Sequence, residues 1–149
     1  MVEPHTAEFL HAPTPEAPGA ARAFINGQLT QLGSTHDRLD DMLVCTSELS
    51  TNAVQHGSRD HSFRVRLIVD PASVRIEVYD FGKGRPRVCR LCEAHHSVEH
   101  GRGLLLVKEL SDGWGVDPHP RIGKTVWSEF KTDAYAAGVQ AAAVAYSNP

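Results

Sequence analysis

Two neighbouring segments with alternating side chains constrain the fold of this chain more than any other feature. Phe63–Val69 and Val74–Asp80 largely alternate apolar and polar residues, and a turn at Asp70–Ser73 joins them. Such alternation is typical of strands that bury one face and expose the other to water. The short connection predicts that the two strands pair as an antiparallel hairpin. The apolar face of this hairpin then needs a covering layer from elsewhere in the chain.

Two segments before the hairpin have the period of amphipathic helices and can supply this layer. The first is expected to run from Gly19 to a stop at Gly33. The second is expected to follow a cap at Ser34 or Thr35 and to end near Gly57. Its apolar stripe consists of Leu39, Met42, Leu43, Thr46, Leu49, Ala53 and Val54.

Shorter segments complete the predicted architecture. Ala7–Ala12 is expected to form an edge strand and Leu104–Leu110 a third helix. Trp114–Val116 and Thr125–Phe130 are expected to form two final strands. Because helices and strands do not alternate regularly, the pattern predicts an α+β fold with the helices on one face of a sheet.

The composition predicts one cytoplasmic domain. The chain has 149 residues, which suits a single domain with a core at about 7–131 and a tail at 132–149. A formal net charge of −3 argues against direct nucleic-acid binding, and no apolar run is long enough to cross a membrane. The number of cysteines is three, an odd number that fits a reducing compartment better than a disulfide framework.

The second predicted helix carries two polar residues that could form a site. Glu48 and Asn52 are four residues apart, so they project from the same side of a helix. A carboxylate and a carboxamide together offer a base and an oxygen ligand for a hydrated cation such as Mg²⁺. For such a pair taken alone, a solvated polar face is the commoner interpretation.

A glycine motif and a late threonine could bind a base. In Asp80-x-Gly82-x-Gly84 the aspartate ends a strand, where its carboxylate could accept a hydrogen bond from an exocyclic amine such as that of adenine. The two glycines let the backbone approach a ligand closely. Thr125 places a hydroxyl at the start of the last strand, from which it could reach the same base directly or through water. An ordinary turn leaving a strand is the alternative.

A second glycine motif could bind phosphate. In Gly101-Arg102-Gly103-Leu104 two glycines are expected to open the third helix. The free N–H groups at a helix start form an anion site, and Arg102 adds a charge that can pair with phosphate oxygens. A glycine cap beside a solvent-facing arginine is the alternative.

The loop between the two glycine motifs contains two further groups of residues. The basic residues that could grip a polyphosphate are Lys83, Arg85, Arg87 and Arg90. The residues that could hold zinc are Cys89, Cys92, His95, His96 and His100. Because the spacing after the cysteine pair is shorter than in a zinc finger, a loop with incidental Cys and His is the preferred interpretation.

The order and spacing of these motifs resemble one superfamily, the Bergerat-fold (GHKL) ATPases. The shared pattern is an Asn-bearing helix, Asp-x-Gly-x-Gly after a hairpin, a variable loop, Gly-x-Gly-Leu and a late Gly-x-Thr strand. Within that superfamily, the sequence Glu-Leu-x-Thr-Asn-Ala-Val-x-His-Gly at Glu48–Gly57 is similar to the corresponding motif of the anti-sigma factor serine/threonine kinases. The resemblance covers Ala20 to Phe130 and implies a two-layer sandwich with a mixed, mostly antiparallel sheet.

The resemblance also implies a role for each matched residue. Glu48 would be the general base, and Asn52 would coordinate Mg²⁺ on ATP. Asp80 would bind the adenine amino group, and the loop from Arg85 to His100 would be the ATP lid. The other nucleotide-binding residues would be Gly82, Gly84, Gly101, Arg102, Gly103, Leu104 and Thr125.

The implied function is that of an ATP-dependent protein serine/threonine kinase. It would phosphorylate an anti-anti-sigma factor of the STAS type and sequester a sigma factor, with homodimerisation left open. One alternative is a non-catalytic nucleotide-binding module that only sequesters a protein partner. Another is a zinc-dependent or redox sensor built on the loop cysteines. The presence of both Glu48 and Asn52 favours the enzyme, since a pure binder does not need a base.

Overall fold

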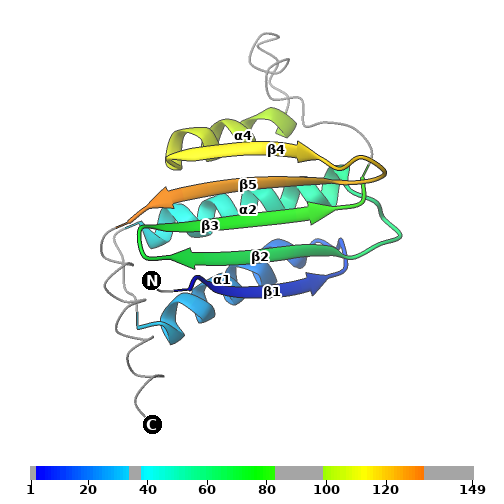
Figure 1. The fold of residues 1–149 in the computed structure, drawn as a ribbon. Coiled ribbons are helices and arrows are strands. Elements are labelled where there is room, and N and C mark those ends of the chain that lie inside the picture. The colour runs from blue at the N-terminus through cyan, green and yellow to red at the C-terminus, as the bar shows by residue number, and fades with distance from the viewer. Residues whose placement is uncertain (1–2, 34–37, 83–98, 133–149) are drawn as a thin grey trace.

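An antiparallel sheet forms one layer of the fold. The computed structural model describes residues 3–33, 38–82 and 99–132, and five strands lie there in the order β1-β2-β3-β5-β4 (Figure 1). They are β1 (His5–His11), β2 (Phe63–Asp70), β3 (Ser73–Asp80), β4 (Gly113–Pro118) and β5 (Lys124–Lys131). The α+β class is confirmed. The described strands contain no parallel pair, where a mixed sheet was expected.

The predicted hairpin is present as β2 and β3, which pair from Arg64 with Tyr79 to Asp70 with Ser73. Residues along both strands alternate between buried and partly exposed, as the sequence pattern requires. The predicted edge strand is also present as β1, although it begins at His5.

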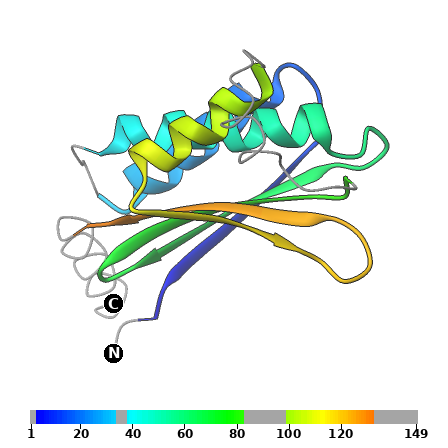
Figure 2. The same cartoon turned by 90° about the horizontal axis from the view of Figure 1, so that it is seen from above.

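Helices cover one face of this sheet, as Figure 2 shows in a view along the layers. In the described part of the chain they are α1 (Ala17–Gln31), α2 (Leu39–His56) and α4 (Glu99–Leu110). Within these residues, no helix has the length and apolar character needed to cross a membrane. The predicted stop of α1 is confirmed, because Gly33 adopts a φ of 71° that favours glycine.

The start of α2 differs from the prediction. The helix begins after Arg38, which makes no side-chain cap hydrogen bond, so the predicted cap at Ser34 or Thr35 is wrong. Those two residues lie outside the described part of the chain. Asp40 and Asp41 in the first turn favour this start instead, because their charges lie at the positive end of the helix dipole.

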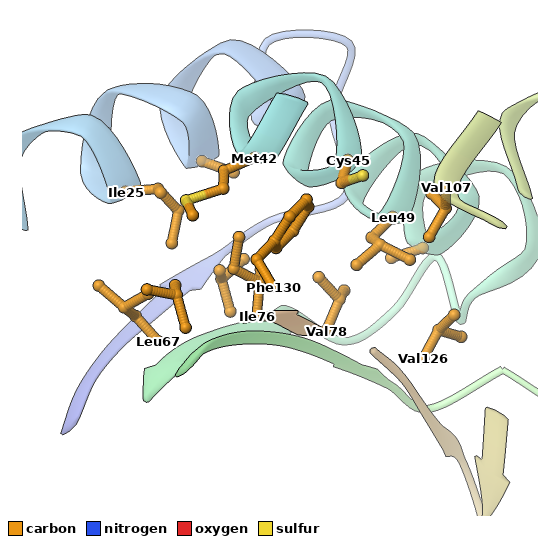
Figure 3. Packing of buried hydrophobic residues seen from close by; sticks show 14 of the residues in the cluster. Ile25, Met42, Cys45, Leu49, Leu67, Ile76, Val78, Val107, Val126 and Phe130 are labelled. Carbon is orange, nitrogen blue, oxygen red and sulfur yellow. The ribbon is translucent and has the colours of Figure 1, made fainter. Parts of the chain in front are cut away.

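The core lies between the two layers (Figure 3). The inner face of the sheet contributes Leu67, Ile76, Val78, Val126 and Phe130, all at most 1% exposed. The helices contribute Ile25, Met42, Cys45, Leu49 and Val107, none of which is exposed. Burying a side chain of this size stabilises the fold by about 1.5–3 kcal/mol, so this interdigitation fixes α2 against β3 and β5.

A close approach of backbone segments fixes the end of α2 over the end of β3. A Cβ at Gly57, the residue after α2, would overlap the Ala53 carbonyl and lie 3.1 Å from Asp80 Cβ. A Cβ at Gly82 would overlap the His56 carbonyl and lie 2.7 Å from Gly57 Cα. Only glycine fits at these two positions, and the result is that α2 ends directly against Asp80.

Candidate functional site

Asn52 lies one turn after Glu48 on α2, as predicted, and it is almost completely buried. Its side-chain oxygen Oδ1 has no hydrogen-bond partner among the described residues. Leaving such an acceptor unpaired costs roughly 1–3 kcal/mol, and buried polar atoms are rarely left so. A carboxamide oxygen is a suitable ligand for a hard cation, so Asn52 fits the expected Mg²⁺ site.

Glu48 lies where α2 meets α4. Its side chain is half-buried, and this burial raises the pKa of the carboxyl group above its usual value. A Cβ at Gly103 would lie 2.5 Å from Glu48 Oε2 and 3.4 Å from Cδ. The absence of a side chain at Gly103 therefore leaves the space that the carboxylate occupies. The structure thus brings the predicted base against the second glycine motif.

Asp80 ends β3, as predicted, and is 2% exposed. Its Oδ1 accepts a hydrogen bond from the Gly82 backbone N–H at 2.8 Å. Lys124 Nζ lies 3.1 Å from both carboxylate oxygens and forms a buried ion pair with them. Asp80 and Gly82 are thus brought together, and Lys124 joins them.

Lys124 is the site residue that sequence reasoning missed. It stands opposite Asp80 in the register of β3 and β5, and it faces inward like Val126 and Phe130. The signal was available, because alternation backwards from Phe130 places Lys124 on the buried face and Thr125 on the other.

Thr125 is not brought to Asp80. It pairs with Tyr79 on the face of the sheet that the helices leave open, and its hydroxyl lies 2.8 Å from His119 Nε2. The expectation that Thr125 lies near the base therefore has no support in this geometry.

The phosphate motif lies further inside its helix than predicted. Because α4 begins at Glu99, Gly101 and Gly103 are its third and fifth residues and do not open it. Leu104 is 2% exposed and belongs to the hydrophobic core. The side chain of Arg102 lies outside the described residues, as does Gly84.

The basic residues predicted to bind the polyphosphate lie in the loop at 83–98, as do the candidate zinc ligands other than His100. This loop is also outside the described residues. His100 is the second residue of α4, so the expected loop ends earlier than Arg85–His100, but nothing is described of its side chain. Elsewhere in the described chain, no three His, Cys, Asp or Glu residues are grouped to hold a metal ion.

Comparison with known proteins agrees with this arrangement. A family model described as a histidine kinase-like ATPase domain matches residues 11–128, a span that includes Glu48, Asn52, Asp80 and Gly103. The chain belongs to this family. The predicted resemblance to the GHKL superfamily and its anti-sigma factor kinases is thereby confirmed.

Curated relatives include two bacterial kinases. The chain is 26% identical over 130 residues to the serine-protein kinase RsbW of Bacillus subtilis, covering 77% of this chain and 81% of the relative. It is 29% identical over 110 residues to the serine-protein kinase RsbW of Bacillus velezensis, covering 66% of this chain and 69% of the relative. These similarities support a kinase-type ATPase of the anti-sigma factor kinase family.

Solved structures share the fold. The RsbU and RsbW domains of a Mycobacterium tuberculosis protein match with a TM-score of 0.64 at 22% identity. That match covers 85% of this chain and 32% of the other, so this chain spans about a third of it. The SiaB–SiaC complex from Pseudomonas aeruginosa matches with a TM-score of 0.58 at 10% identity, over 83% of this chain and 88% of the other.

Proposed function

We propose that this chain is an ATP-dependent protein serine/threonine kinase that uses Mg²⁺. The observation that carries the proposal is the pairing, on one helix, of a buried amide oxygen without a partner and a desolvated carboxylate. Asn52 supplies the oxygen and Glu48 the carboxylate, and a binder that only sequesters nucleotide has no need for the second. The family and the RsbW relatives support the same conclusion.

Each residue then has a chemical task. Asn52 Oδ1 would hold Mg²⁺, which when bound neutralises charge on the triphosphate. Asp80 would accept a hydrogen bond from the amino group of adenine, and the N–H groups at the start of α4, around Gly101, would face the phosphates. Gly82 would let the base approach the end of β3.

Glu48 would act as the general base. The hydroxyl oxygen of the acceptor residue attacks the γ-phosphorus, its proton passes to the Glu48 carboxylate, and ADP leaves. A raised pKa makes this carboxylate a better proton acceptor than an exposed one. Gly103 leaves the space in which the carboxylate can approach the phosphate motif.

The acceptor would be a serine on an anti-anti-sigma factor of the STAS type. A phosphate group adds charge and acceptor oxygens to such an interface and would release the partner. The freed kinase would then sequester a sigma factor in the cytoplasm, in monomeric or homodimeric form. The relatives named serine-protein kinase RsbW support this assignment.

The first test is calorimetric titration of ATP, with and without Mg²⁺, into wild type, Asn52→Leu and Ser50→Ala. Ser50 is a matched control, because its hydroxyl is also buried without a partner but lies about 200° around α2 from Asn52. We expect Mg²⁺ to strengthen ATP binding to wild type and to Ser50→Ala but not to Asn52→Leu. Absence of ATP binding to the folded wild type would refute the nucleotide site.

The second test separates the kinase from the non-catalytic module. Glu48→Gln keeps the size of the side chain and removes the base, so it should bind Mg-ATP with near wild-type affinity. Transfer of ³²P from ATP to a purified STAS-domain partner should fall at least 100-fold. Wild type that binds Mg-ATP but transfers no phosphate would support the non-catalytic module instead.

A further inference from the structure

The ion pair between Asp80 and Lys124 leaves one acceptor without a hydrogen bond. The two side chains are 3% and 2% exposed, and Lys124 Nζ donates to Asp80 Oδ1 at 3.1 Å. Oδ1 also accepts the Gly82 N–H, so it has two donors. Oδ2 lies within ion-pair distance of Nζ, yet it is buried and has no hydrogen bond to any described residue. It therefore has room for one more donor.

The ammonium group of Lys124 has N–H bonds that no described residue accepts. An ammonium group carries three N–H bonds, and among the described residues only Asp80 accepts one of them. The pair therefore presents an oxygen that can accept a further hydrogen bond, Oδ2, beside N–H groups on Nζ that no described residue accepts. An amine that donates to Oδ2 at about 3 Å would lie no more than about 6 Å from Nζ.

The position of Lys124 places it in the proposed site and not behind it. It stands opposite Asp80 across β3 and β5, and both side chains point toward the helices. The end of α2 lies over Asp80, since Gly57 closely approaches that residue. This is the end of α2 that carries Asn52. A base bound to Asp80 on this face lies within reach of the ammonium group.

We propose that Lys124 is a specificity-determining residue of the nucleotide site, which donates a hydrogen bond to N1 of adenine while Asp80 Oδ2 accepts one from the N6 amine. This inference rests on the proposed function. Adenine presents an amine donor and a ring acceptor on neighbouring atoms of its Watson–Crick edge, and the pair offers the complementary acceptor and donor. A carboxylate alone would recognise only the N6 amine, whereas the pair recognises both the N6 amine and N1.

The test compares ATP with 1-deaza-ATP, in which a C–H replaces N1. A hydrogen bond from a charged donor contributes roughly 10- to 100-fold in affinity. We therefore expect wild type to bind 1-deaza-ATP at least tenfold more weakly than ATP in Mg²⁺-containing buffer. Lys124→Met should bind the two nucleotides with equal affinity, because it has no donor to lose. Calorimetry gives both affinities without reference to turnover.

Each result has a definite meaning. Folded wild type that does not bind ATP refutes the proposed function itself. Wild type that binds ATP and 1-deaza-ATP equally refutes only the role of Lys124. A tenfold difference that persists in Lys124→Met also refutes it, because another donor must then contact N1.

A measurement on wild type covers the case in which Lys124→Met does not fold, since this variant leaves the Asp80 charge buried without its partner. The chain has four lysines, and NMR of their ¹⁵N-labelled ammonium groups can follow the buried one. We expect ATP to shift the Lys124 signal and 1-deaza-ATP to shift it much less. Equal shifts with both nucleotides would overturn the proposal.

Discussion

Substitution of Gly103 by alanine should affect folding and catalysis in opposite directions. Gly103 lies inside α4, where alanine is a better helix former than glycine by about 1 kcal/mol. The new Cβ would lie 2.5 Å from Glu48 Oε2. The carboxylate must therefore withdraw by about 1 Å to reach an ordinary contact distance of about 3.5 Å. It can do so, because it is the end of a flexible, half-buried side chain.

Three magnitudes follow for Gly103→Ala. The free energy of unfolding should stay the same or rise by up to about 1 kcal/mol, which corresponds to a Tm higher by roughly 2–4 °C for a chain of this size. Displacing a catalytic group by about 1 Å can lower the rate about 100-fold. Phosphate transfer should therefore fall by about that factor, while the affinity for Mg-ATP changes no more than about threefold.

The matched control is Gly27→Ala. Gly27 lies inside α1, and a Cβ there would meet nothing within 4 Å. This variant should gain the same stability and keep wild-type transfer. Thermal denaturation, calorimetry and ³²P transfer to a STAS-domain partner measure the three quantities. Equal transfer rates for the two variants would show that Gly103 does not position Glu48. If the free energy of unfolding of Gly103→Ala falls by more than about 1 kcal/mol, the Glu48 carboxylate cannot move away from the new methyl group.

Three further predictions concern pH and packing. Burial raises the pKa of Glu48, so its ionised form opposes folding and Glu48→Gln should be more stable than wild type at pH 7. This difference should shrink as pH falls through the raised pKa and vanish below the usual one, and a constant difference in urea titrations would contradict the assignment. A backbone N–H of β5 and the Arg38 guanidinium hold the pKa of Asp112 below its usual range. Asp112→Asn should therefore lower the free energy of unfolding by about 1 kcal/mol at pH 7, an effect that solvent exposure limits. The effect should be lost as pH falls through the depressed pKa. A Cβ at Gly115 would lie 2.7 Å from the indole ring of Trp127 on β5, whereas one at Gly113 would lie 3.7 Å from it. Gly115→Ala should therefore lower the free energy of unfolding by about 1–3 kcal/mol, and Gly113→Ala should change it little. Similar Tm values for the two variants would contradict this packing.

The period of the sequence was sufficient to predict the element types and the layer arrangement. The hairpin of β2 and β3 and the amphipathic α2 have strong patterns that any compact fold must satisfy. Helix starts were less predictable. Tertiary contacts fix the start of α2, because Arg38 donates to Asp112 and to the Leu110 carbonyl and stacks on Phe130. No local cap signal reports such contacts.

The candidate site was predictable where a residue lies on a single element. The spacing of Glu48 and Asn52 required only that α2 be a helix, and Asp80 required only that β3 end there. Contacts between elements were not predictable in the same way. The proximity of Gly103 to Glu48 depends on how α4 packs on α2. The position of Thr125 was also predictable, since strand alternation alone assigns it to the open face.

Asn52, Glu48 and the Asp80–Lys124 pair all hold polar groups in surroundings that oppose folding. Replacing a buried group that has no partner should therefore stabilise the protein without nucleotide, and Asn52→Leu should raise the free energy of unfolding by roughly 1–3 kcal/mol. Bound Mg-ATP reverses the comparison, because a ligand at 100 times its Kd stabilises a protein by about 2.7 kcal/mol. Wild type should thus melt below Asn52→Leu without nucleotide and move toward or above it with saturating Mg-ATP. If Mg-ATP shifts the two Tm values equally, the unpaired oxygen of Asn52 has no part in binding the ligand.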